Sequence, residues 1–206
     1  TLSSSSAASD VYKRQMDSGL VLYLSRSQDM VGGRSQNCLP AGLTASFLLQ
    51  GQAEVVIANQ RLQMDSRRTG SPAMLVHLRE EEAFQRHWQA GREETKVSLH
   101  LGQDWLSRQL DGIASAGITR LRLSHARNQA WQPPAPLLRR AAALFGAETV
   151  EPPLLASLQR ESFALEVAAS VVRSVIAERE APAPSAHLRR CVDQLQQWPV
   201  SYTHLR

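Results

Sequence analysis

Three histidines on predicted strands are the side chains best placed to hold a metal ion. His77, His87 and His100 could converge inside a small barrel, where neutral imidazole nitrogens bind metals well. The sequence has no HxH pair, however, and no carboxylate follows at the spacing typical of such sites. Isolated histidines on strands are more often core or surface residues than ligands. We therefore expect neither a metal site nor a cofactor.

The motifs of common enzyme classes are also missing from the sequence. There is no GxSxG nucleophile elbow, no GxxxxGKS/T phosphate loop and no GxGxxG dinucleotide fingerprint. Neither Cys38 nor Cys191 belongs to a CxxC pair. We therefore expect no catalytic residue and no enzymatic activity.

Aromatic and cationic side chains together give a candidate ligand site. Trp88 ends a predicted strand beside Arg86, His87 and Arg92. An aromatic ring can stack on a planar ligand, and cations at a barrel rim would attract an anionic ligand or an iron chelate. We take Arg86, His87, Trp88 and Arg92 as the candidate effector-binding residues.

Composition sets broad bounds on the class of protein. The chain has 206 residues, of which 43% are apolar and 20% charged, with a formal net charge of +4. The apolar fraction is enough for a hydrophobic core. The basic excess is mild, so it is compatible with nucleic-acid binding but not diagnostic of it. Two cysteines are too few for a disulfide framework, which favours a reducing cytoplasm. No run of about 18 apolar residues is present, so we expect no membrane contact.

The elements that would position these side chains begin with short strands over residues 16–102. Apolar stretches separated by turn residues predict an antiparallel meander that closes into a half-barrel or small barrel. The loop Gly32–Pro40 is polar and carries two glycines. The predicted strands are Leu20–Ser25, Leu43–Gln50, Ala53–Ala58, Arg61–Asp65, Ala73–Leu78, Phe84–Trp88 and Thr95–Leu101.

The period changes to that of helices over residues 103–180. The predicted helices are Asp104–Leu110, Pro136–Phe145 and a long one at Leu154–Arg179, whereas Ile118–Arg127 is ambiguous. A stiff proline–alanine linker follows at 181–186, and an amphipathic helix at 187–199.

The long helix has an apolar stripe at alternating steps of three and four residues. This spacing keeps the stripe on one side of the helix and suits pairing with a second copy. The same stripe could instead be the face that packs on its own domain, and the sequence leaves both readings open. The candidate dimerisation residues are Leu155, Leu158, Ser162, Leu165, Ala169, Val172 and Ile176.

The two ends of the chain differ from the rest. Residues 1–15 are serine-rich and show no strand or helix period, and they resemble translated sequencing-adapter read-through, as do residues 200–206. We expect these two segments to be artefactual or disordered tails, and we expect the native protein to continue past Pro199.

Taken in order, the elements resemble an AraC-type transcriptional regulator of the branch that responds to pyochelin and related siderophores. The resemblance covers roughly residues 16–199. It lies in LVLYLS at 20–25, GLTASFLLQGQAEVVIANQRLQM at 42–64, KVSLHLGQDWLSRQL at 96–110, LQRESFALEVAASVV at 158–172 and LRRCVDQLQQWP at 188–199.

The resemblance implies an α+β fold with a cupin-like antiparallel half-barrel that senses an effector. A helical dimerisation region would follow, and then the first helix of a truncated helix-turn-helix domain. It also implies a homodimer and a small-molecule effector. In the branch that the chain resembles, this effector is a siderophore or an iron chelate. DNA would bind only to the full-length protein, because neither recognition helix is present. The alternative is a stand-alone cupin-like small-molecule-binding protein or a metal-dependent isomerase.

Overall fold

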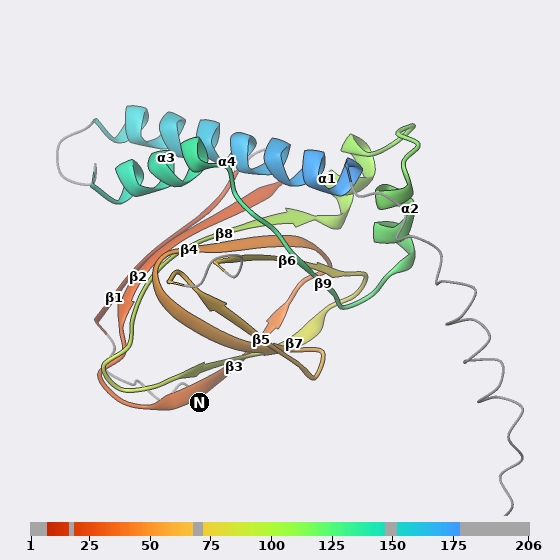
Figure 1. Cartoon of the computed structure of the whole chain (residues 1–206). Helices are drawn as coiled ribbons and strands as arrows, with labels where there is room; N and C mark the ends of the chain where they lie inside the picture. The colour runs from red at the N-terminus through yellow and green to blue at the C-terminus, as the bar shows by residue number, and fades with distance from the viewer. Residues whose placement is uncertain (1–7, 17–18, 68–71, 147–151, 178–206) are drawn as a thin grey trace, which may run out of the picture.

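The computed structural model describes residues 8–16, 19–67, 72–146 and 152–177. Its strands are β1 Ala8–Gln15, β2 Leu20–Gln28, β3 Gly33–Leu39, β4 Gly42–Ile57, β5 Gln60–Asp65, β6 Ala73–Leu78, β7 Glu82–Trp88, β8 Glu93–Gly102 and β9 Arg127–Ala130. Its helices are α1 Gln103–Gln109, α2 Ala116–Leu123, α3 Ala135–Gly146 and α4 Pro153–Ile176. The strands curl into a barrel, and α3 and α4 lie across one side of it (Figure 1). The predicted fold class, an α+β protein with an antiparallel half-barrel followed by a helical region, is confirmed.

Two sheets that share β4 form the barrel. The first has the order β1-β2-β8-β4-β6-β9, with antiparallel neighbours throughout. The second half of β4 pairs instead with β5 and β7, and β7 pairs with β3. The strand changes sheets at a bulge between Leu48 and Gln50. Gly51 follows with a φ of +90°, and a Cβ there would lie 1.8 Å from the carbonyl oxygen of Glu93, so the bend requires glycine.

Alternation along the strands sorts their side chains into two apolar cores. One face of the first sheet presents Leu22, Phe47 and Leu99, all fully buried, to the helices. The other face joins the second sheet around an apolar group inside the barrel: Leu48, Ala53, Val55, Ile57, Leu62, Met64, Met74, Val76 and Leu78. The helices therefore cover the barrel without contributing to the core that lies inside it.

One face of α4 packs on the first sheet. Phe163, Val167 and Val171 are fully buried in the core that the helix shares with the sheet. Helix α3 lies beside α4, and Arg140 of α3 pairs with Glu166 and donates a 3.0 Å hydrogen bond to the hydroxyl of Ser162. Helix α2 contacts α4 near its other end (Figure 1). These contacts fix which side of α4 is left facing outward.

The structure corrects the prediction of two strands joined by a turn at Gly51. Leu43–Gln50 and Ala53–Ala58 belong to one continuous strand, β4. A bulge followed by a glycine with positive φ bends a strand sharply while the hydrogen-bond ladder continues on both sides. In the sequence this bend looks the same as a hairpin turn.

Three further segments differ from the sequence-based prediction. The predicted loop Gly32–Pro40 contains β3, which pairs with β7. The segment 1–15, predicted to have no strand, contains β1, which pairs with β2. Strand β9 joins β6 although it lies outside the predicted β-rich range 16–102. β3 and β9 take their hydrogen bonds from strands distant in the chain, and β1 takes its own from the next strand, so the composition of each segment alone does not predict the strand.

The predicted linker at 181–186 and the predicted helix at 187–199 lie outside the described residues, as do residues 1–7 and 200–206. Of the helices that the structure describes, none has both the length and the apolar character required to cross a membrane.

Candidate functional site

The inside of the barrel has a polar side as well as an apolar one. Neighbouring positions of β4 and β8 place hydrogen-bonding pairs there. The hydroxyl of Thr44 lies 3.0 Å from Nδ1 of His100, and the hydroxyls of Ser46 and Ser98 lie 2.9 Å apart. Because buried polar groups need partners, these pairs make a hydrophilic wall compatible with the protein interior.

Four charged residues continue the polar side: Asp29, Arg86, Glu94 and Lys96, here termed the charged cluster. The side chains of Asp29 and Glu94 are only 1% and 3% exposed. Nη2 of Arg86 lies 3.4 Å from Oδ1 of Asp29 and 3.3 Å from Oε2 of Glu94. Nζ of Lys96 lies 2.6 Å from Oε1 of Glu94.

The charged cluster is balanced, with two carboxylates facing two cations. Burial acts to raise the pKa of Glu94, but Lys96 and Arg86 outweigh it and hold the pKa below its ordinary value. Arg86 is therefore committed to carboxylates of its own chain and is a poor candidate for binding an anionic ligand. Oδ2 of Asp29 is buried and has no hydrogen-bond partner among the described residues.

Trp88 lies on the same face of β7 as Arg86, two residues further along. The guanidinium of Arg86 lies 5.4 Å from the centroid of the Trp88 ring, a cation–π distance. Gly33 of β3 is paired with Trp88, and a Cβ at Gly33 would lie 3.0 Å from the indole. The indole is thus held in place by a cation and by a glycine that leaves room for it.

The other two predicted effector-binding residues face elsewhere. Alternation along β7 places His87 on the outer face, where its Nδ1 lies 4.0 Å from Oε1 of Glu54. Arg92 lies in the β7–β8 turn and donates a long, weak hydrogen bond of 3.5 Å to the carbonyl of His87. The structure therefore does not bring the four predicted residues into one site.

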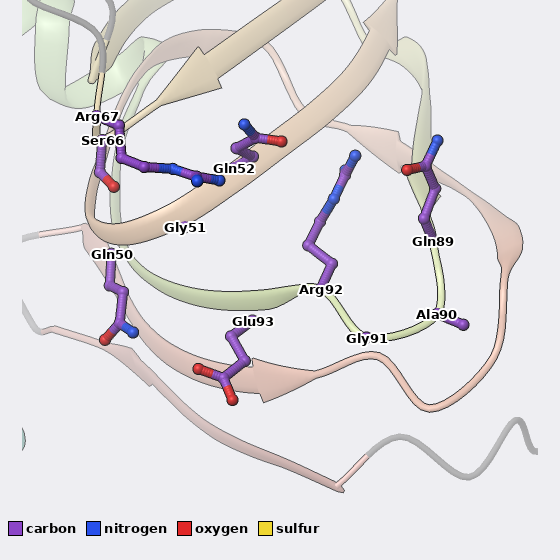
Figure 2. A pocket seen from close by; sticks show the side chains of 10 residues that line it. All are labelled: Gln50, Gly51, Gln52, Ser66, Arg67, Gln89, Ala90, Gly91, Arg92 and Glu93. Atoms are coloured by element: carbon purple, nitrogen blue, oxygen red, sulfur yellow. The ribbon is translucent and has the colours of Figure 1, made fainter.

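Arg92 lines a cleft of about 520 Å³ at the end of the barrel where β7 turns into β8 (Figure 2). Sequence reasoning found Arg92 but missed Arg67, which comes from the segment after β5. No local pattern links these two arginines, because the ends of separate hairpins bring them together. The lining residues are Gln50, Gly51, Gln52, Ser66, Arg67, Gln89, Ala90, Gly91, Arg92 and Glu93.

The three histidines considered as metal ligands face three different regions. His77 faces the helices, and its Nδ1 lies 3.0 Å from the carbonyl oxygen of Ser124. His100 faces the barrel interior, and His87 the outside. Burial lowers the pKa of both His77 and His100, which favours neutral rings held by hydrogen bonds. These histidines do not converge.

Glu80, Glu82 and His125 form a group on the surface that brings three possible metal-ligand atoms close together. Nε2 of His125 lies 3.0 Å from Oε1 of Glu82, and its Nδ1 accepts a 3.2 Å hydrogen bond from the backbone N–H of Arg79. Since Nδ1 is the acceptor, the proton resides on Nε2, and both nitrogens are engaged. The geometry is that of a hydrogen-bonded pair at a strand end.

The predicted stripe of α4 faces outward. Leu155, Leu158 and Leu165 are 50%, 52% and 48% exposed, and Ile176 is 38% exposed. Ser162 and Ala169 are exposed as well, and Val172 is partly buried. At about 100° per residue, the centre of this stripe lies roughly 160° around the helix from the centre of the buried face. The stripe is therefore separate from the core that anchors the helix.

Comparisons with known proteins place the chain in context. A family model described as the regulatory protein PchR N-terminal domain matches residues 8–198. No curated protein sequence matches the chain.

Solved structures that are similar to the chain include the AraC-like transcriptional activator CuxR. It is 8% identical, with a TM-score of 0.45, over 93% of this chain and 64% of that one. The cupin domain of an XRE-family transcriptional regulator from Enterobacter cloacae is 9% identical, with a TM-score of 0.35, over 47% of this chain and 96% of its own. A cupin superfamily protein from Desulfitobacterium hafniense is 16% identical, with a TM-score of 0.35, over 50% and 84% of the two chains.

Proposed function

Because the chain belongs to the family of the regulatory protein PchR N-terminal domain, we propose that it is the effector-sensing and dimerisation part of an AraC-type transcriptional regulator. In this role the chain binds a ligand and performs no catalysis. The full-length regulator would add the DNA-binding unit and act in the cytoplasm. Ligand binding would shift the population of states in which two copies present their DNA-binding units at a fixed spacing.

The observation that carries the proposal is that α4 is apolar on two opposite faces. One face is buried against the sheet, and the other exposes leucines that no described residue covers. A surface helix normally turns its second face to water with polar residues, so a second apolar face indicates a partner. The alternating three- and four-residue spacing is that of helices that pair with each other, which makes a second copy of this chain the proposed occupant.

The first test is to place charges in the exposed stripe. Leu158→Glu combined with Leu165→Glu should raise the dimer Kd by at least about 100-fold, because four leucines leave the interface of a symmetric pair. The measurement is analytical ultracentrifugation over a range of protein concentrations. Both positions lie outside the core, so the variant should remain folded. Circular dichroism should give it the thermal unfolding midpoint that the unsubstituted protein shows when it is dilute enough to be monomeric.

Leu123→Glu is the matched control for this test. Leu123 is 75% exposed and belongs to α2 and not to the stripe of α4, so this change should leave the dimer intact. A double variant that stays dimeric, or an unsubstituted protein that remains monomeric at high concentration, would contradict the proposed interface.

We further propose that the effector is a siderophore or its iron chelate. This rests on the resemblance to pyochelin-responsive regulators and on the arginines of the cleft, which suit an anionic ligand. Trp88 lies near this end of the barrel, at the end of β7, and gives the site an optical reporter.

Titration with ferric pyochelin should quench part of the tryptophan fluorescence in a saturable manner, with at least about tenfold tighter binding than for iron-free pyochelin. Trp88→Phe should remove most of the quenched signal while Trp131→Phe should not. Equal affinity for the two forms, or quenching that never saturates, would rule out an iron-chelate effector.

A further inference from the structure

The cleft at the barrel end combines donors from three separate segments of the chain. Its residues come from the bend of β4, the segment after β5, the β7–β8 turn and the first residue of β8. At about 520 Å³ it falls within the size range of small-molecule sites. Figure 2 shows Arg67, Gln52 and Arg92 extending to the same side of the Gly51 bend.

The two arginines of the cleft retain most of their donor capacity. The contact between Nε of Arg67 and Oδ1 of Asp65 is 3.8 Å long, and the Arg67 side chain is 77% exposed. Arg92 donates the 3.5 Å bond to the carbonyl of His87. Each guanidinium carries five N–H donors in a planar fork that matches a carboxylate, and these contacts occupy few of them. Arg86 differs, because buried carboxylates already surround it.

The carboxylates near the cleft do not cancel these cations. Glu93 is the single acid among the lining residues, and in Figure 2 it points to the opposite side of the Gly51 bend from Arg67 and Arg92. Arg92 also lines an adjoining hollow of about 150 Å³, together with Glu54 and Asp65. Glu54 forms a 2.8 Å ion pair with Arg61, and this contact lowers the pKa of Glu54. Asp65 accepts a 2.9 Å hydrogen bond from the amide of Gln52.

Main-chain hydrogen bonds hold both arginine-bearing segments in position. The N–H of Asp29 donates to the carbonyl of Arg92 at 2.8 Å, and the N–H of Gly91 donates to the carbonyl of Asp29 at 2.7 Å. The N–H of Ser66 donates to the carbonyl of Gly51 at 3.0 Å. A site whose supports are fixed before binding loses less entropy when a ligand arrives.

We propose that this cleft is an anion clamp, in which Arg67 and Arg92 together hold the carboxylate of a small ligand while the amides of Gln52 and Gln89 bond its polar oxygens. The proposal rests on the proposed function, since it assigns the clamp to the effector site, and it deepens that function by naming the group that the site recognises as a carboxylate. Arg67 becomes a binding residue that no sequence pattern indicates.

The test uses citrate as a tricarboxylate probe, with inorganic phosphate and neutral glycerol as comparators. Isothermal titration calorimetry at low ionic strength should give saturable citrate binding, at least about tenfold tighter than phosphate, and no binding of glycerol. Arg67→Gln and Arg92→Gln should each weaken citrate by about tenfold. Arg108→Gln, which removes an exposed arginine on α1, should leave the affinity unchanged.

Citrate affinity that persists in the Arg67→Gln/Arg92→Gln double variant would overturn the clamp, as would phosphate binding equal to that of citrate. If citrate fails while the dimer and the ferric-siderophore titration succeed, the clamp alone is wrong. If those two tests fail while citrate binding depends on both arginines, the clamp stands and its assignment to an effector site is wrong.

Discussion

Replacing Arg86 with methionine should lower the free energy of unfolding by about 3–5 kcal/mol, the usual cost of removing one partner from a buried ion pair. Asp29 would lose the cation that it contacts, and Glu94 would keep only Lys96. Methionine preserves most of the apolar volume, so the loss would reflect the stranded carboxylates more than missing contacts. Equilibrium unfolding in urea measures the change.

Two variants separate charge from packing in this experiment. Arg108→Met alters an exposed arginine on α1 and should change stability by no more than about 0.5 kcal/mol. Adding Asp29→Asn to Arg86→Met should recover a substantial part of the loss, because the buried negative charge is removed together with its partner. If Arg86→Met costs no more than Arg108→Met, the charged cluster does not hold the barrel together.

Gly51→Ala should cost about 3 kcal/mol or more, because it combines backbone strain with overpacking. The φ of +90° disfavours any residue with a Cβ, and the new Cβ would lie 1.8 Å from the carbonyl oxygen of Glu93. Relief requires β4 and β8 to move apart where β4 changes sheets. Thermal and urea unfolding would both register the change.

Gly91→Ala is the matched control, since Gly91 also has a positive φ of +79° but has nothing within 4 Å of an added Cβ. It should cost only the strain of the left-handed conformation, about 1–2 kcal/mol. Equal costs at the two positions would mean that β4 and β8 are not in close contact at the bend.

The elements with a strong local pattern are those that the sequence predicts well. The predicted strand Ala73–Leu78 coincides with β6, and the predicted long helix coincides with α4 to within a few residues over the described range. β3 and β9 escape prediction because polar residues dominate them and their hydrogen bonds come from β7 and β6. Pairing with a distant strand outweighs local preference in both.

The candidate site shows the same division between local and long-range information. The period of α4 places Leu155, Leu158 and Leu165 on one side of the helix, and they lie there. Whether that side is core or surface depends on which face of the helix meets the sheet, and contacts with strands distant in the chain decide that. The sequence alone does not show that His87 faces the opposite side of β7 from Arg86 and Trp88. It also does not show that Arg86 is paired with Asp29 and Glu94, which are distant in the chain or on another strand.

Strand β4 pairs with β5, β6, β7 and β8, so each of the two sheets includes it. Each sheet is divided once β4 detaches, because β4 joins β8 to β6 in the first sheet and β5 to β7 in the second. We therefore expect the barrel to unfold as one cooperative unit. The pairings of β4 with β8 also join distant parts of the chain, from Gly42 with Gly102 to Gly51 with Glu94. Closing such long loops before any contact forms makes the barrel slow to fold, whereas the helices that follow it depend mostly on local contacts.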